Sequence, residues 1–266
     1  VRSYIVSAIF RRNSVFFRPY GAMWRQALET FDTLFVQNVE SKRLLSEIGF
    51  DNVVVAGDTR FDRVAQIAAA AQRVETIERF RGGGRLFVAG STWGPDEEIL
   101  LPLVNANPDV KFVIAPHEMD EGRIAHLMRD AKGGAVRYTQ CDAATRFDDV
   151  QVLVLDTMGM LSSVYGSATW AYVRGGFGVG IHNTLEAATF GLPIAFGPNY
   201  GKFKEARDMV SLGCAVSVRT AGELAAWFAP LRDDEETLRR ASRTAKDYTA
   251  RNQGATGIIL RSIFNS

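Results

Sequence analysis

A glycine-rich loop between an apolar segment and a helical segment places the strongest limit on the fold. Residues 168–173 are apolar, glycine stands at four of the positions 175–180, and a helical pattern begins at Asn183. This order of strand, loop and helix is typical of phosphate-binding α/β folds, because glycines let backbone amides approach an anion and a helix start adds unpaired amides. We therefore predict that the amides of residues 175–184 surround a phosphate group.

The first turn of that helix carries polar residues that suit a nucleotide. Asn183 or Thr184 is a candidate N-cap, and Glu186 follows in the first turn. A carboxylate there stabilises a helix end, but it could also accept hydrogen bonds from the two hydroxyls of a ribose whose phosphate lies on the loop. The glycine spacing differs from GxGxxG and no acidic residue ends a following strand, so neither a nicotinamide nor a flavin is indicated. We expect a nucleotide ligand and no cofactor.

The composition fits a globular protein of one large domain or two small ones. Of the 266 residues, 47% are hydrophobic, and 31 Lys and Arg nearly balance 30 Asp and Glu, so there is no general attraction to nucleic acid. Cys141 and Cys214 lie far apart without a CxxC pattern, and the sequence therefore indicates neither a disulfide scaffold nor a metal site. No apolar run approaches the ~20 residues that span a bilayer.

Apolar segments that alternate with helical patterns predict a Rossmann-like parallel sheet. A doubly wound α/β domain is expected over residues 85–249, with strands near residues 85, 111, 136, 150, 168, 193 and 214. Apolar segments at 33–37 and 52–56 predict the tail of a second Rossmann-like domain over residues 1–62. Two strands need partners to bury a sheet, and we expect these partners before Val1.

Other segments join or end these domains. Residues 63–84, an Ala-rich helical pattern that runs into three glycines, form a predicted linker, and residues 250–266 a terminal helix. Residues 9–25 interleave arginine with aromatic side chains and could face phosphate head groups, although ordinary packing is the preferred interpretation. The polar residues of the segment 58–62 follow a strand end, where a ligand contact and a solvated turn with a helix cap explain them equally well.

Three other strand ends carry candidate ligand contacts, because open α/β sheets bind ligands at the carboxyl ends of their strands. Ser91 and Thr92 could cap the next helix, which is the preferred interpretation, or hold a phosphate. His117, which follows Pro116, could contact a phosphate or a base, or be an ordinary loop residue. Gly159, at the start of a predicted helix, would let a ligand approach the backbone closely.

Taken together, several motifs resemble those of the 3-deoxy-D-manno-octulosonic acid (Kdo) transferases, which add Kdo to the lipid A precursor in Gram-negative bacteria. In chain order they are GDTRFD (57–62), GSTWGPDEE (90–98), the PHE turn after KFVIA (111–118), DTMGML (156–161) and GGFGVGIHNTLEAATFGLPIAFGP (175–198). The resemblance covers nearly the whole chain, with the motifs in the right order. The resemblance implies a GT-B glycosyltransferase, whose two Rossmann-like domains face a cleft and whose second domain holds the CMP of the donor CMP-Kdo.

The resemblance assigns the family's CMP contacts to nine residues of this chain. They are Pro116, His117, Met158, Gly159, Met160, Asn183, Thr184, Leu185 and Glu186. Two of them depart from the family pattern. His117 stands where Arg is usual, and histidine is charged only part of the time near neutral pH. Met160 stands where an acidic residue is common, which would alter recognition of the base or the ribose.

The resemblance also implies what the chain lacks. The family's catalytic base is a Glu near the start of the first domain, where the membrane-associated segment also lies, so we expect a fragment that binds CMP-Kdo weakly and transfers nothing. The intact protein is expected at the cytoplasmic face of the inner membrane, with the lipid A precursor as acceptor, and the fragment is expected to be soluble. Two alternatives stay open: another GT-B nucleotide-sugar enzyme, such as a UDP-sugar epimerase, against which DTMGML argues, and a non-catalytic nucleotide-binding or protein-interaction module.

Overall fold

The computed structural model describes residues 1–178 and 180–264. Two compact units make up the chain: unit 1 comprises Val1–Gln66 with Ala250–Ser266, and unit 2 comprises Ile67–Thr249. Val179 of the predicted phosphate loop, and residues 265 and 266 of the predicted terminal helix, lie outside the described residues. The domain boundaries predicted at residues 62, 84 and 249 stay predictions.

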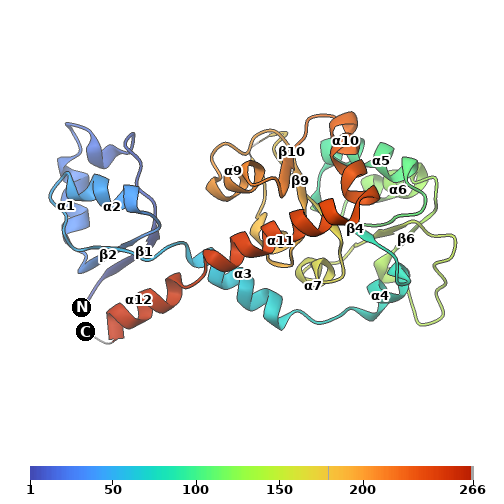
Figure 1. Ribbon diagram of the computed structural model, residues 1–266, viewed down its shortest axis with the longest axis horizontal. Coiled ribbons are helices and arrows are strands. Elements are labelled where there is room, and N and C mark those ends of the chain that lie inside the picture. The colour runs from blue at the N-terminus through green and yellow to red at the C-terminus, as the bar shows by residue number, and fades with distance from the viewer. Residues whose placement is uncertain (179, 265–266) are drawn as a thin grey trace. The chain divides into compact units, whose positions relative to one another are not determined.

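In its described residues, unit 2 is built on a seven-stranded parallel sheet. The strand order is β10-β9-β8-β4-β5-β7-β6, and every pairing is parallel. This confirms the predicted Rossmann-like sheet. Strands β4, β6, β9 and β10 of this sheet are labelled in Figure 1. The strands are β4 (Leu86–Thr92), β5 (Lys111–Pro116), β6 (Ala135–Arg137), β7 (Val152–Val154), β8 (Trp170–Val173), β9 (Ile194–Phe196) and β10 (Ala215–Ser217).

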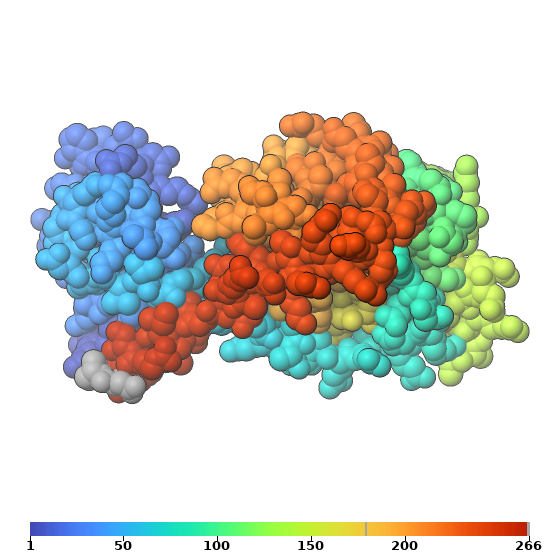
Figure 2. Space-filling model, viewed as in Figure 1, coloured from blue at the N-terminus to red at the C-terminus, as the bar shows by residue number. Residues whose placement is uncertain are grey.

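Helices cover both faces of this sheet, because successive strand residues point to opposite faces and both sets are apolar. One face packs against α4 (Glu75–Arg81), α7 (Leu161–Tyr165), α8 (Leu185–Thr189) and α9 (Lys204–Ser211). The other face packs against α5 (Gly94–Ala106), α6 (Glu121–Asp130) and α10 (Ala221–Asp233). Side chains of α11 (Glu235–Arg251) enter both cores, and Figure 2 shows α10 and α11 at the surface of this unit.

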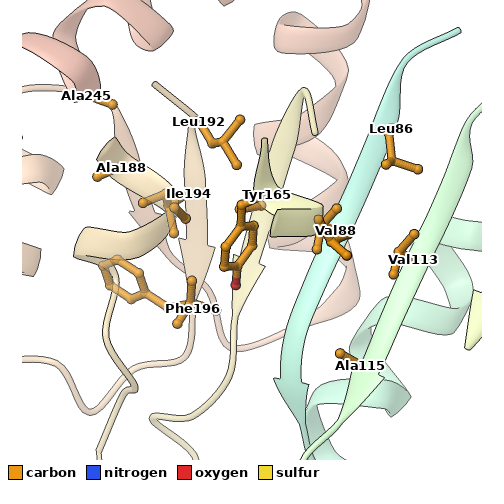
Figure 3. Packing of buried hydrophobic residues seen from close by; sticks show 14 of the residues in the cluster. Leu86, Val88, Val113, Ala115, Tyr165, Ala188, Leu192, Ile194, Phe196 and Ala245 are labelled. Carbon is orange, nitrogen blue, oxygen red and sulfur yellow. The ribbon is translucent and has the colours of Figure 1, made fainter. Parts of the chain in front are cut away.

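A tyrosine fills the centre of the first core. Figure 3 shows Tyr165 of α7 among apolar side chains from β4 and β9, including Val88 and Ile194. Its hydroxyl group reaches Gly90, where an added Cβ would lie 2.2 Å from Oη. Only glycine therefore fits at this position near the carboxyl end of β4.

Unit 1 contains, within its described residues, a three-stranded parallel sheet in the order β1-β2-β3. The strands are β1 (Tyr4–Ala8), β2 (Thr33–Val36) and β3 (Val53–Val55), and the accompanying helices are the short 3-10 helix Val15–Phe17, α1 (Ala22–Glu29), α2 (Val39–Ser46), α3 (Thr59–Ala70) and α12 (Ala255–Phe264). The second and third strands match the prediction. The first strand, β1, was not predicted. It pairs with β2, so residues 4–8 supply one of the partner strands that were expected before Val1. The helical pattern predicted over residues 63–81 is divided between α3 and α4.

The two acidic residues of the polar segment 58–62 make contacts within unit 1. Asp62 accepts hydrogen bonds from the backbone amides of Gly254, at 2.6 Å, and Thr256, at 2.7 Å, at the start of α12. Asp58 forms an ion pair with Arg60, with 2.7 Å between oxygen and nitrogen. The two carboxylates therefore serve a helix cap and a local ion pair.

The aromatic residues of segment 9–25 divide between packing and exposure. Phe10 is buried and makes edge contacts with Phe16 and Phe17. Tyr20 and Trp24 are exposed. Ordinary packing thus explains the three phenylalanines but leaves the other two aromatic rings at the surface.

We expect Phe228→Ala to lower the free energy of unfolding by about 3–5 kcal/mol, because it opens a cavity in the second core. Phe228 is 1% exposed, and its ring meets those of Trp170 at 4.9 Å and Phe87 at 5.7 Å. Leu212→Ala is the control, since Leu212 is 53% exposed and surface changes cost within about 0.5 kcal/mol. Urea unfolding followed by circular dichroism measures both, and equal effects of the two changes would contradict the assignment of this core.

Candidate functional site

The parallel sheet of unit 2 brings the predicted site residues to one edge. Strands β4, β5, β7 and β8 are neighbours and parallel, so the segments after them leave the sheet on the same side. The segments begin at Trp93, His117, Leu155 and Arg174. Ligand contacts predicted from four separate parts of the sequence thus belong to one edge.

Glu186 is the centre of a polar cluster at this edge. Its carboxylate accepts hydrogen bonds from the hydroxyl of Ser162 and from the side-chain amide of Asn183, both at 3.1 Å. The side-chain oxygen of Asn183 in turn accepts from the backbone amide of Leu185, at 3.1 Å. These contacts connect the start of α7 to the start of α8. They orient the Glu186 carboxylate while leaving it capacity for further donors, since an ionised carboxylate has about four acceptor sites.

The loop before α7 lies next to this cluster and is open. Met158 is 83% exposed, and Gly159 has a φ of 82°. No described atom lies within 4 Å of a Cβ placed on Gly159. Met160 is partly buried against the first core, and its carbonyl accepts from the amide of Val164. The backbone at Met158 and Gly159 is therefore open, and the ligand contact at Gly159 stays a prediction.

Three of the other predicted contact residues are buried. Pro116, at the end of β5, is buried, and Leu185 is fully buried, so its side chain serves packing. Thr184 takes the N-cap position of α8 without a side-chain capping bond. It is 1% exposed, and its hydroxyl has no hydrogen-bond partner among the described residues. A buried hydroxyl without a partner is unfavourable unless another group completes it.

Ser91 and Thr92 differ in what they offer. Ser91 adopts a φ of 57°, uncommon for a residue other than glycine, where the pairing of β4 with β5 shifts register. Thr92 is fully buried, and its hydroxyl donates to Glu97 at 2.8 Å. Neither caps α5, because Trp93 holds that position. The preferred prediction of a cap was therefore wrong, and the Thr92 hydroxyl is committed inside the protein.

An aromatic and basic cluster occupies the other part of the edge. The ring of His117 stacks on Trp93 at 5.7 Å and meets His182 edge-on at 5.4 Å. The guanidinium of Arg174 lies over the Trp93 ring at 4.9 Å from its centre. His117 is exposed. Its ring contacts that of His182, and Asn183 of the polar cluster is the next residue in the chain.

The glycine loop uses several of its amides internally. Gly175 donates to Asp96 at 3.3 Å, and Gly176 donates to the carbonyl of Gly180 at 3.0 Å. His182 donates to the carbonyl of Arg174 at 3.0 Å. These amides do not point to a ligand, so the predicted phosphate cradle over 175–184 does not include them. The glycines permit a close backbone crossing instead, since a Cβ on Gly176 would lie 2.4 Å from the carbonyl carbon of Gly197.

Burial and neighbouring charges set the protonation of the cluster. Burial first, and then the charges of Arg174 and His117, lower the pKa of His182 below 6.5, while Asp96 opposes them. Burial, with the Asp96 carboxylate next to it, raises the pKa of Tyr172. His182 is therefore neutral at neutral pH and can both donate and accept a hydrogen bond. The described residues contain no group of three or more His, Cys, Asp or Glu side chains placed to hold a metal ion.

Comparisons with known proteins agree with the resemblance seen in the sequence. A 3-deoxy-D-manno-octulosonic acid (Kdo) transferase from Rickettsia felis is 23% identical over 205 residues, which cover 74% of this chain and 43% of that protein. One from Rickettsia bellii is 23% identical over 236 residues, which cover 85% of this chain and 55% of that protein. The chain is a homologue of proteins named Kdo transferase. It spans about half the length of these curated relatives, and no family model matches it.

Solved structures show the same fold. The C-terminal CMP-Kdo binding domain of WaaA from Acinetobacter baumannii has a TM-score of 0.52 at 20% identity, over 69% of this chain and 96% of that one. UDP-GlcNAc 2-epimerase from Neisseria meningitidis, solved with UDP-GlcNAc, has a TM-score of 0.63 at 16% identity, over 99% of this chain and 69% of that one. The GT-B-like fold shared with Kdo transferases is therefore shown.

Sequence reasoning missed four residues of the edge: Ser162, Trp93, Arg174 and His182. Ser162 and His182 carry no signal of their own, because their importance depends on contacts with other loops. Arg174 carries one signal, since it is a charged residue directly between an apolar strand and a glycine loop. The site residues carried over from the family stay predictions.

We expect Gly176→Ala to lower the free energy of unfolding by about 1–3 kcal/mol, because the added methyl group clashes with Gly197 and the backbone needs a positive φ. The φ of Gly176 is 96°. Gly178→Ala is the matched control in the same loop, since its Cβ meets no described atom within 4 Å. Thermal unfolding of both variants tests this, and an unchanged Gly176→Ala variant would show that the crossing is not rigid.

We expect stability to fall on acidification partly because of His182. Its pKa is lower in the folded chain than in the unfolded chain, so the unfolded chain binds the proton first. The penalty is absent well above about pH 6.5, grows as the pH falls from there towards the lower folded pKa, and levels off below it. His182→Gln should lose less stability than the original protein between about pH 7 and pH 5 in urea unfolding. An identical loss in both would mean that His182 does not titrate differently on folding.

Proposed function

We propose that this chain binds CMP-Kdo and forms the donor-binding part of a glycosyltransferase that moves Kdo to a lipid A precursor. One observation carries the proposal: Glu186 is held by Ser162 and Asn183 beside the open loop at Gly159, in a homologue of Kdo transferases. A carboxylate with free acceptor sites next to accessible backbone suits a ribose and its phosphate. The match of the fold to a CMP-Kdo binding domain supports the same donor.

Each proposed contact has a role that its surroundings allow. The Glu186 carboxylate accepts from the two ribose hydroxyls, and Asn183 and Ser162 fix its orientation. The exposed backbone of Met158 and Gly159 and the partly buried Met160 face the nucleotide. The buried hydroxyl of Thr184, which has no hydrogen-bond partner among the described residues, forms a hydrogen bond with the ligand.

His117 and Pro116 complete the nucleotide contacts at the end of β5. The exposed imidazole of His117 is fixed by its stack on Trp93 and by its backbone amide, which donates to the carbonyl of Thr92 at 2.9 Å. Leu185 contributes through its backbone, since its side chain is buried. Ser91, with its left-handed backbone, adds a hydroxyl at the adjacent strand end.

The reaction that follows from this donor is an inverting transfer. A general base takes the proton of an acceptor hydroxyl, whose oxygen attacks the anomeric carbon of Kdo, and the bond from that carbon to the phosphate oxygen breaks. The bond's electron pair leaves with CMP. Groups that bind the phosphate would stabilise this departing charge. None of the residues proposed here is the base, so their part is to bind and orient the donor.

For the intact protein we propose association with the cytoplasmic face of the inner membrane. The support is local: Tyr20, Met23 and Trp24 are exposed and follow the exposed Arg18 closely in the sequence, a mixture that suits an interface of lipid and water. No described helix is long and apolar enough to cross a membrane.

The fold also favours a second candidate, an enzyme acting on a UDP-sugar. The similarity to UDP-GlcNAc 2-epimerase extends over 99% of the chain. The motif DTMGML and the Kdo transferase homologues favour the first candidate. A third possibility is a non-catalytic nucleotide-binding module. Such a module would have the same nucleotide contacts as the proposed transferase but would not transfer the sugar.

We expect the chain to bind CMP more tightly than UMP or UDP in calorimetric titrations. Glu186→Gln should weaken CMP binding by about tenfold or more, because two charge-assisted hydrogen bonds to the ribose become weaker. Glu118→Gln is the control, since Glu118 is an exposed acid near the same edge. Equal binding by Glu186→Gln would remove Glu186 from the site. Preference for UDP would favour the second candidate, and restored transfer in the presence of the remaining enzyme sequence would exclude the non-catalytic module.

A further inference from the structure

An arginine at the carboxyl end of β8 has unused hydrogen-bonding capacity. Nη1 of Arg174 is buried and has no hydrogen-bond partner in the described part of the chain. Burying a cationic donor without a partner is unfavourable, and the cost is recovered when an anion accepts from it. No contact of the nucleotide proposed above uses this group.

Arg174 is held in place by its backbone and by an aromatic ring. Its amide donates to the carbonyl of Gly90, and its carbonyl accepts from His182, both at 3.0 Å. Its guanidinium lies 4.9 Å from the centre of the Trp93 ring. The cation is therefore positioned before any ligand arrives, which reduces the entropy lost on binding.

A cavity of about 290 Å³ is lined in part by Arg174. Its wall comprises Trp93, Pro95, Asp96, Arg174, Phe177 and three glycines, Gly175, Gly178 and Gly180. Small-molecule sites measure about 300–1,000 Å³. The cavity therefore suits one sugar unit better than a whole nucleotide sugar.

The other charge in the cavity wall is already committed. Oδ1 of Asp96 accepts from the hydroxyl of Tyr172 at 2.7 Å and from Gly175, and Oδ2 accepts from the amide of Trp93 at 2.9 Å. Burial lowers the pKa of Arg174, while Asp96 and the more exposed Glu118 partly offset this. An oxyanion in the cavity would stabilise the guanidinium further.

We infer that Arg174 binds the carboxylate of the transferred sugar acid and thereby selects an acidic over a neutral donor sugar. The inference rests on the proposed function, because it takes Kdo as that sugar. His117 joins the two parts of the site: it contacts Trp93 on the cavity side and His182, next to Asn183, on the nucleotide side. A sugar in the cavity and a nucleotide at Glu186 would thus lie along the same edge of the sheet. The competing source of an oxyanion is the phosphate of the nucleotide.

Calorimetric titration of the full chain with free Kdo, with its methyl ester and with CMP tests the inference. We expect the ester, which lacks the negative charge, to bind at least about tenfold more weakly than the acid. Arg174→Gln should lose about tenfold or more in affinity for the acid while keeping its affinity for CMP within about twofold. Arg146→Gln is the matched control, since Arg146 is 87% exposed in a surface ion pair with Asp148.

The two proposals can fail separately. Acid binding that equals ester binding, absent acid binding, or equal acid affinity of Arg174→Gln and the original protein would overturn the inference. A parallel loss of CMP affinity in Arg174→Gln would assign Arg174 to the phosphate and also overturn it. Binding of the acid without binding of CMP would leave the carboxylate site in place and refute the nucleotide proposal. The comparison of acid with ester needs no variant, so it decides even where Arg174→Gln does not fold.

Discussion

A single buried carboxylate organises the functional edge of this protein. Asp96 is 1% exposed and receives hydrogen bonds from the start of α5, from Tyr172 of β8 and from the first glycine of the loop that follows. A buried charge is tolerated only when several donors surround it, and these donors come from three separate segments. The carboxylate therefore fixes where the glycine loop leaves the sheet, and with it the positions of Arg174 and Trp93.

The edge is divided between two kinds of recognition. On the side of α7 and α8, polar groups hold Glu186 next to open backbone, which suits a nucleotide. On the side of α5, an aromatic ring and a positioned cation border a small cavity, which suits an acidic sugar. His117 touches both sides.

The sequence predicts the sheet better than the site. Strands buried on both faces read as apolar runs, so those of unit 2 were recognisable, whereas β1 has partly exposed residues and no such run. Glu186 was placed at its helix start from local pattern alone. The use of the Gly175 amide was not predictable, because its partner Asp96 lies 79 residues away in the sequence. The Gly176 amide pairs within the loop itself, with the carbonyl of Gly180, and the glycine spacing does not show this. Arg174 and Trp93 were missed because they lie in the segments after two different strands, β8 and β4, and meet only in the fold.

The crossing of the glycine loop with the segment after β9 has a mechanical consequence. Gly197 donates to the carbonyl of Gly175, Asn199 donates to that of Gly176, and the Asn199 side chain donates to that of Gly178. Three hydrogen bonds join the two loops, so we expect them to move together as one rigid unit and not independently. Neither loop can change its length or path without the other following, so evolutionary variation in one should be accompanied by compensating variation in its neighbour.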